Sequence, residues 1–363
     1  MTSKHFLLAG LLIGASLVAS LSGCGPSDPS EKAASGAAET QAASALTAAG
    51  SSFAAPLISR WMKRYGEQHP DLALSYASVG SGEGIKRFIA GEVAIGATDA
   101  PLKPEEIAQI DGAFAQLPIT GGMIALAYNL PGVDGPLNLP RDVYVDIFLN
   151  KIHRWDDPRI QAANPGLALP SKLIQVVARR DSSGTTFAFT NHLASIAPAW
   201  AEQYSVGKQI GWPSGTMLAS GNEGVAQRVK ITHGAIGYVE AGFARRLHLP
   251  LAWLENRTGG LIAPTADTGQ RALADGSDAM PEDLSVTVPD PEGARSYPIV
   301  TFTWALVRSD YPEPFNTRAV HDFLRWTLTE GQAQAADLGF VPLPETLARA
   351  SLLELDGLSG IAR

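Results

Sequence analysis

The chain has 363 residues, a formal net charge of −8 at neutral pH and one cysteine. A single cysteine excludes a disulfide within the chain and a metal site built from cysteine thiolates. The acidic balance argues against a protein that holds nucleic acid by neutralising its phosphates. A small anion can still be bound, because backbone amides, helix dipoles and one arginine supply local positive charge.

The N-terminus has the pattern of an export signal. Lys4 and His5 precede an apolar stretch, residues 6–21, that is short for a membrane span but suits a signal peptide. Residues 21–24 read Leu-Ser-Gly-Cys, which resembles the lipobox of bacterial lipoproteins, where the cysteine thiol takes a diacylglyceryl group. We therefore expect residues 1–23 to be a signal peptide and Cys24 to carry a lipid anchor. An incidental buried thiol is the alternative.

Residues 24–45 have the composition of a flexible tether. They are mostly small or polar, so they cannot bury enough apolar surface to offset the entropy of ordering. We expect them to connect the anchor to a folded part outside the cytoplasm. The length that remains suits one large or two medium domains.

From Leu46 onward, short apolar strands alternate with amphipathic helices, which is typical of an α/β fold with largely parallel sheets. At four places a strand is followed by a polar loop and then by a helix. Strands are predicted at residues 46–50, 72–79, 93–97 and 173–178, and the polar loops at 50–52, 80–84, 98–103 and 179–186. Further along, residues 234–240 read as a buried strand and 321–336 as a helix.

Each polar residue in these loops has an ordinary explanation as a helix cap. Ser51 or Ser52 is the candidate cap of the first helix and Ser81 that of the second. Asp99 is placed to cap a helix that begins near Leu102. Capping alone would give these residues a structural role and no ligand.

Taken together, the four loops suit a small tetrahedral anion. In open α/β sheets, ligands bind at the carboxyl ends of the strands, where helix N-termini present unpaired N–H groups. Ser52, Ser81 and Ser183 lie near glycines, which let the backbone approach an oxyanion closely. Arg179 lies two residues before Asp181, so a carboxylate can hold its guanidinium in place.

Together, the residues of these loops resemble a known family, the phosphate-binding proteins of phosphate-specific ABC transporters. These proteins have the type II periplasmic-binding-protein fold. The resemblance runs from about Leu46 to Pro344. Its strongest segments are AGSSFAAP at 49–56, GSGEG at 80–84, GATDAPL at 96–102, RRDSSGTTF at 179–187, GNEG at 221–224 and GAIGYVE at 234–240.

The resemblance implies roles for the first three loops. Ser52 and the amide of Phe53 match the first phosphate-contacting turn, where the family often has threonine in place of the serine. Ser81 matches the second contact. Asp99 matches the buried carboxylate that accepts the proton of phosphate.

The fourth loop matches the family's cationic contact. Counting back from Ser-Gly-Thr places the single cation at Arg179 and not at the neighbouring Arg180. Asp181 matches the carboxylate that pairs with the arginine. The donors at the start of the following helix match Ser183, Gly184 and Thr185.

The family's architecture is two α/β lobes joined by two crossing strands, with the ligand in the cleft between them. Applied here, it predicts a first lobe built from residues 46–120 and 300–363 and a second lobe from 121–299. The crossings fall near residues 118–121 and 298–302. The implied partners are inorganic phosphate and the membrane permease subunits of a phosphate ABC transporter, with the protein acting as a monomer and without a metal or cofactor.

Three alternatives stay open. A binder of another tetrahedral oxyanion, such as sulfate, would use the same fold, although Asp99 argues against it. A binding protein that serves sensing or adhesion would look the same in sequence. A phosphatase-like enzyme has little support, because the chain contains no Gly-x-Ser-x-Gly elbow and its histidines and aspartates do not cluster.

Overall fold

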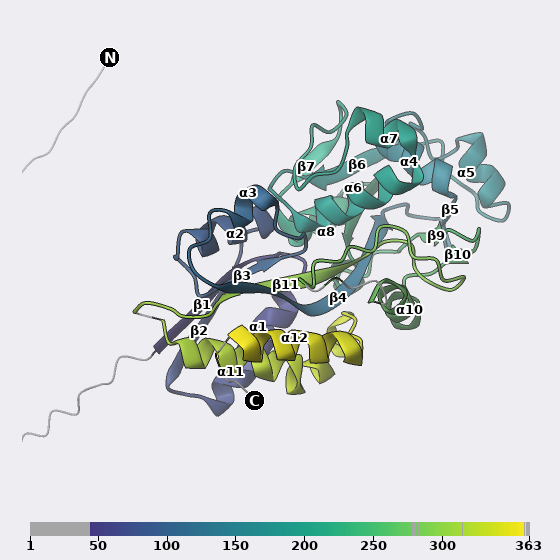
Figure 1. Cartoon of the computed structure of the whole chain (residues 1–363). Helices are drawn as coiled ribbons and strands as arrows, with labels where there is room; N and C mark the ends of the chain where they lie inside the picture. The colour runs from purple at the N-terminus through teal and green to yellow at the C-terminus, as the bar shows by residue number, and fades with distance from the viewer. Residues whose placement is uncertain (1–43, 278–280, 282, 314, 359, 361–363) are drawn as a thin grey trace, which may run out of the picture. The chain divides into compact units, whose positions relative to one another are not determined.

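The computed structural model describes residues 44–363, except 278–280, 282, 314, 359 and 361–363 (Figure 1). The predicted signal peptide, Cys24 and nearly all of the predicted tether lie outside the described residues. No helix in the described part of the chain is both long and apolar enough to cross a membrane.

The first half of the main sheet is parallel. Strands β1 (Ser44–Gly50), β2 (Leu72–Ser78) and β3 (Ile95–Thr98) lie with β1 in the centre. Helices α1 (Ala55–Gln68) and α2 (Ser81–Ile89) connect them and bury their apolar faces. The three strands therefore end at one edge of the sheet, next to the N-termini of these helices, as the sequence predicted. The strand β1 begins two residues earlier than expected.

The second half repeats this arrangement later in the chain. Strands β6 (Gln175–Arg179), β7 (Met217–Ala219) and β8 (Ala235–Glu240) are parallel, with β6 in the centre. Helix α6 (Gly184–Ile196) follows β6, and α8 (Gly221–Ile231) follows β7. The N-termini of both helices again lie at the carboxyl ends of the strands.

Two long strands join the halves. Strand β4 (Phe114–Tyr128) pairs antiparallel with β11 (Val300–Arg308) over residues 114–123 and with β8 over residues 124–128. The resulting eight-stranded order is β2-β1-β3-β11-β4-β8-β6-β7. The α/β class with two crossing strands is confirmed. Strand β4 contains the first expected crossing, and β11 begins at Val300, within the second.

The other elements cover the sheet or extend it. Helix α12 packs on β4 and against α11, and a small sheet has the order β10-β9-β5 (Figure 1). The helix predicted at 321–336 begins earlier and ends at Leu328, where two 3₁₀ segments follow. The remaining bounds are α3 (Pro104–Ile107), β5 (Asn138–Leu139), α4 (Arg141–Phe148), α5 (Pro158–Ala163), α7 (Pro198–Gln203), α9 (Ala241–Arg246), β9 (Trp253–Glu255), β10 (Leu261–Ile262), α10 (Ala266–Ser277), α11 (Thr317–Leu328), η1 (Glu330–Gln334), η2 (Ala336–Leu338) and α12 (Glu345–Leu358).

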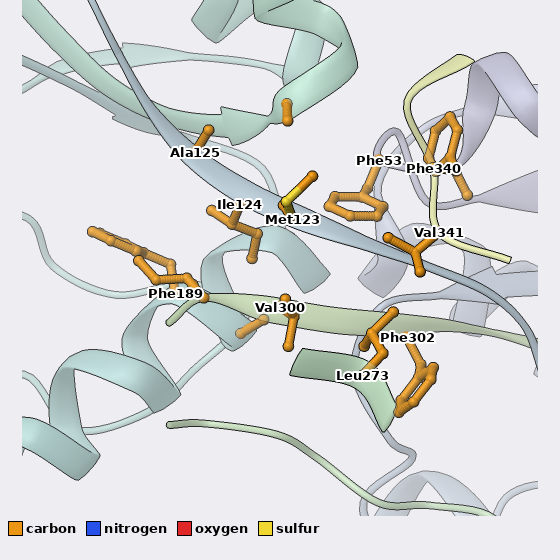
Figure 2. Close-up of a cluster of buried hydrophobic side chains, with 14 of the residues drawn as sticks. Phe53, Met123, Ile124, Ala125, Phe189, Leu273, Val300, Phe302, Phe340 and Val341 are labelled. Atoms are coloured by element: carbon orange, nitrogen blue, oxygen red, sulfur yellow. The ribbon is translucent and has the colours of Figure 1, made fainter. Parts of the chain in front are cut away.

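An apolar cluster at the crossing strands fixes the turn before α1. Phe53 is fully buried and meets Phe340 edge-on, with ring centroids 6.0 Å apart (Figure 2). A Cβ atom at Gly122 on β4 would lie 2.7 Å from the Phe53 ring, so the absence of a side chain there makes room for the ring. Because Phe53 is held in this way, the backbone of the neighbouring Ser52 is held with it.

Candidate functional site

The carboxylate of Asp99 lies at the centre of the candidate site. The residue follows β3 and is only 1% exposed. Its Oδ1 accepts hydrogen bonds from the Ser51 hydroxyl at 2.5 Å and the Thr303 hydroxyl at 2.7 Å, and its Oδ2 from the Ser81 hydroxyl at 3.3 Å. Burial raises the pKa of Asp99 to about 6, although these hydroxyls and the nearby Arg179 oppose the rise. Asp99 is therefore ionised at neutral pH but unusually easy to protonate.

The capping explanation of Asp99 is wrong. The helix after it, α3, begins at Pro104, and Lys103 is its N-cap. The side chain of Asp99 is instead bonded to hydroxyls from three other segments. A buried carboxylate whose hydrogen bonds come from hydroxyl groups is expensive to maintain for structure alone, which favours a role in binding.

Ser81 does not cap helix α2 either. The N-cap is Gly80, and no side chain caps this helix. The hydroxyl of Ser81 instead accepts hydrogen bonds from the amides of Asp99 and Gly184, each at 3.1 Å. Ser81 thus connects the first half of the sheet to the start of α6 in the second half.

Of the two serines before α1, Ser51 has the local structural role. Its hydroxyl accepts a hydrogen bond from the amide of Ala54 at 3.0 Å and donates to Asp99. Ser52 is buried, and its hydroxyl accepts hydrogen bonds from Asn222 in the second half. The sequence predicted Ser51 or Ser52 as the cap of α1, and this prediction is wrong, because the N-cap is Ala54 and no side chain caps the helix.

Arg179, at the end of β6, is fixed by Asp181. Its Nε lies 2.8 Å from Asp181 Oδ1, and its Nη2 lies 2.5 Å from Oδ2, so the pair is bidentate. Burial raises the pKa of Asp181, but the bonds from Arg179 outweigh this and hold the pKa below its usual range. The side chain of Arg179 is 1% exposed, whereas Arg180 is exposed to solvent. Of the two arginines, only Arg179 is buried beside the other predicted site residues.

The N-terminus of α6 brings backbone donors close to Asp99. The hydroxyl of Ser183 caps the helix by accepting from the amide of Thr186 at 3.0 Å. A Cβ atom on Gly184 would lie 2.6 Å from Asp99 Cβ, so only glycine permits this approach. The hydroxyl of Thr185 lies 3.4 Å from Nη1 of Arg179. Of these three predicted residues, Ser183 therefore caps α6, Gly184 lets the backbone approach Asp99, and Thr185 contributes a hydroxyl.

The N-terminus of another helix, α8, also reaches the site and was not predicted as part of it. The amide of Gly221 donates to Asp181 Oδ1 at 3.1 Å. The side chain of Asn222 donates to the hydroxyls of Ser52 and Thr185, each at 3.1 Å. The available signal was the GNEG segment directly after a short strand, which has the same form as the other junctions.

An ion pair joins the two halves beside the site. Lys208 Nζ lies 2.5 Å from Glu106 Oε1 on α3, and the two side chains are 10% and 19% exposed. The carbonyl of Lys208 accepts the amide of Ser183 at 2.8 Å. The segment that carries Lys208 therefore supports the start of α6 and also contacts the first half.

The predicted residues meet in a single place. Ser52, Ser81 and Asp99 come from the first half of the sheet, and Arg179, Gly184 and Thr185 from the second half. The set combines hydroxyls, helix-end amides and one guanidinium with a single carboxylate, which is the composition that a partly protonated oxyanion requires. In the part of the chain that the structure describes, no group of three or more His, Cys, Asp or Glu side chains is arranged to hold a metal ion.

Known proteins of one family are similar to this chain. Residues 35–330 match the family model of the PBP superfamily domain. The phosphate-binding protein PstS of Pasteurella multocida is 38% identical, over 84% of this chain and 88% of that protein. PstS of Methanocaldococcus jannaschii is 35% identical, over 95% and 94%.

Solved structures share the fold. A putative phosphate ABC transporter substrate-binding protein from Clostridium perfringens, solved with bound phosphate, has a TM-score of 0.61 at 20% identity and covers 83% of this chain and 100% of that chain. A phosphate-binding protein from Stenotrophomonas maltophilia has a TM-score of 0.66 at 21% identity, with 85% and 93% covered. The chain therefore belongs to the PstS family of phosphate-binding proteins, within the PBP superfamily, and has the type II periplasmic-binding-protein fold.

Proposed function

We propose that the protein binds inorganic phosphate outside the cytoplasm and delivers it to the membrane permease of an ABC importer. The observation that carries the proposal is the buried Asp99 carboxylate, which lies among donors from both halves of the sheet. Phosphate is an anion that still carries a proton near neutral pH, so it can use both the donors and the single acceptor. The names of the relatives, phosphate-binding protein PstS, support the same ligand.

Within this proposal, each residue has a defined task. Asp99 accepts the proton of phosphate, and Arg179 supplies the positive charge while Asp181 holds it in place. The remaining oxygens are met by hydroxyl or amide donors from Ser52, Phe53, Ser81, Ser183, Gly184 and Thr185.

Capture and closure are then one event. The donors come from two segments of the chain, 46–120 and 121–299, which we propose as the first part of lobe 1 and as lobe 2. Residues 300–363 complete lobe 1. A phosphate ion satisfies all of its oxygens only when the lobes are together, so binding favours the closed arrangement.

Calorimetry of the purified protein with phosphate, arsenate and sulfate tests the ligand. We expect phosphate and arsenate to bind, because both keep a proton that Asp99 can accept, and sulfate to bind far more weakly. Absence of any heat with phosphate would refute the proposal. Equal affinity for sulfate would favour a general oxyanion binder, and steady release of phosphate from an ester would favour an enzyme.

Delivery to a permease is tested in cells. Deletion of the gene should lower phosphate uptake at limiting phosphate, and a plasmid copy should restore it. Unchanged uptake in the deletion strain would point to sensing or adhesion instead.

The lipid anchor rests on the sequence, and a single substitution tests it. Cys24→Ala should abolish labelling with radioactive palmitate and stop lipoprotein processing, because Cys24 is the only thiol in the chain. Ser27→Ala, in the same predicted tether, is the matched control and should label normally. Labelling that persists in Cys24→Ala would rule the anchor out.

A further inference from the structure

The buried side chain of Asn222 has a fixed orientation. Its Oδ1 accepts the backbone amide of Glu240 at 2.8 Å. A flipped side chain would turn its NH₂ group toward this amide, so two donors would face each other. The Nδ2 atom of Asn222 therefore has to lie on the side of the candidate anion site.

Nδ2 has two hydrogens and two acceptors. It lies 3.1 Å from the hydroxyl oxygen of Ser52 and 3.1 Å from that of Thr185. The backbone amide of Asn222 also donates to Ser52, again at 3.1 Å. Asn222 is thus a donor in all of its contacts with the two hydroxyls.

These contacts determine what the two hydroxyls can do. A hydroxyl has two lone pairs and one proton. Both lone pairs of Ser52 are used by Asn222, and those of Thr185 are used by Asn222 and by Nη1 of Arg179 at 3.4 Å. The proton of each hydroxyl is then free to be donated, and an anion between the halves is the natural acceptor.

We infer that Asn222 is a positioning residue for anion binding, because it commits the hydroxyls of Ser52 and Thr185 to act as donors. The inference rests on the proposed phosphate binding and adds a residue that does not itself need to touch the ion. Ser52 belongs to the first half of the sheet, whereas Asn222 and Thr185 belong to the second. The donor arrangement at Ser52 is therefore completed only when the halves are together.

A purely structural role for Asn222 would have a different signature. Its contact with Glu240 fixes the start of α8 next to the end of β8, and loss of that contact would lower stability without linking Asn222 to Ser52 in binding. A double-mutant cycle separates the two roles, because it measures the coupling between the residues and not the sum of their effects.

The experiment measures phosphate affinity for wild type, Asn222→Ala, Ser52→Ala and the double variant, with thermal unfolding as a check on folding. We expect each single change to weaken binding about 10- to 100-fold, which corresponds to a hydrogen bond to a charged group. In the Ser52→Ala background, Asn222→Ala should cause a smaller loss than in the wild type, because only its effect through Thr185 remains. Gln227→Ala, an exposed amide on the same helix, is the control and should bind as wild type does.

Asn222→Asp is the second variant, in case Asn222→Ala does not fold. It keeps the shape and the acceptor for the Glu240 amide but turns the donor into an acceptor. Ser52 would then donate its proton to the new carboxylate, so removal of Ser52 should cost no further affinity. Fully additive losses in the cycle would overturn the inference alone, whereas a wild-type protein that binds no phosphate would overturn the proposed function and the inference with it.

Discussion

Asp99→Asn is expected to remove most of the protein's preference for phosphate over sulfate. An ionised carboxylate can only accept a hydrogen bond, and phosphate offers a P–OH group while sulfate at neutral pH offers none. Sites built to hydrogen-bond a group reject the analogue that lacks it by roughly 10⁴–10⁵. In the variant, the amide can donate to an unprotonated oxygen, so phosphate should still bind and sulfate should now compete.

The same carboxylate predicts how selectivity depends on pH. Because burial raises the pKa of Asp99 to about 6, the fraction of protein with a neutral Asp99 grows as the pH falls through 6. A neutral Asp99 can donate, as the asparagine amide can. Sulfate should therefore compete better with phosphate at pH 5 than at pH 7.5 in the wild type. In Asp99→Asn, the residue at position 99 contributes no such change.

Competition of unlabelled sulfate against labelled phosphate measures both effects. Asp71→Asn, an exposed aspartate in the same half of the sheet, is the matched control and should keep the wild-type ratio. A selectivity ratio that stays unchanged in Asp99→Asn would remove Asp99 from the site, whatever the affinity for phosphate.

Arg179→Ala is expected to weaken phosphate binding by about 2–5 kcal/mol, the usual cost of truncating one member of a buried, hydrogen-bonded charge pair. Two effects add in this direction. The anion loses the one buried guanidinium among the predicted contacts, and Asp181 is left without its bidentate partner. An uncompensated carboxylate beside the ligand repels it.

Two further variants resolve these contributions by calorimetry. Arg180→Ala removes an exposed arginine one residue away and should change the affinity little. Arg179→Ala combined with Asp181→Asn removes the unpaired charge, so it should recover part of the lost affinity. If Arg180→Ala has the larger effect, Arg180 and not Arg179 is the cationic contact.

The parts of the site that could be predicted from the sequence are those set by local pattern. A strand followed by a glycine-rich or hydroxyl-rich loop and a helix places Ser52, Ser81, Asp99 and Arg179 at strand ends whatever the rest of the chain does. Arg179 is buried and Arg180 is exposed, and the choice of Arg179 as the cationic contact stays a prediction. The predicted strand ends differ from the observed ones by one or two residues. Strand ends are defined by backbone hydrogen bonds, which the side-chain pattern does not show.

The unpredicted parts depend on contacts between distant segments. Thr303 donates to Asp99 across 204 positions of sequence, and Asn222 contacts Ser52 across 170. The sequence around Thr303 or Asn222 does not indicate which distant residue each side chain will contact. The expected cap at Ser81 failed for the same reason, because its hydroxyl is used by Gly184 in the other half.

The position of β11 in the sheet has a consequence for how the protein folds. This strand, Val300–Arg308, lies between β3 and β4, which come from the first part of the chain. Until residue 308 has been synthesised, β3 and the first part of β4 each lack a neighbour, so the N-terminal half cannot finish its sheet by itself. Pairings of such long sequence separation carry a large loop-closure cost and are typical of slow folding. We therefore expect the first lobe to complete its folding last, although its sequence begins first.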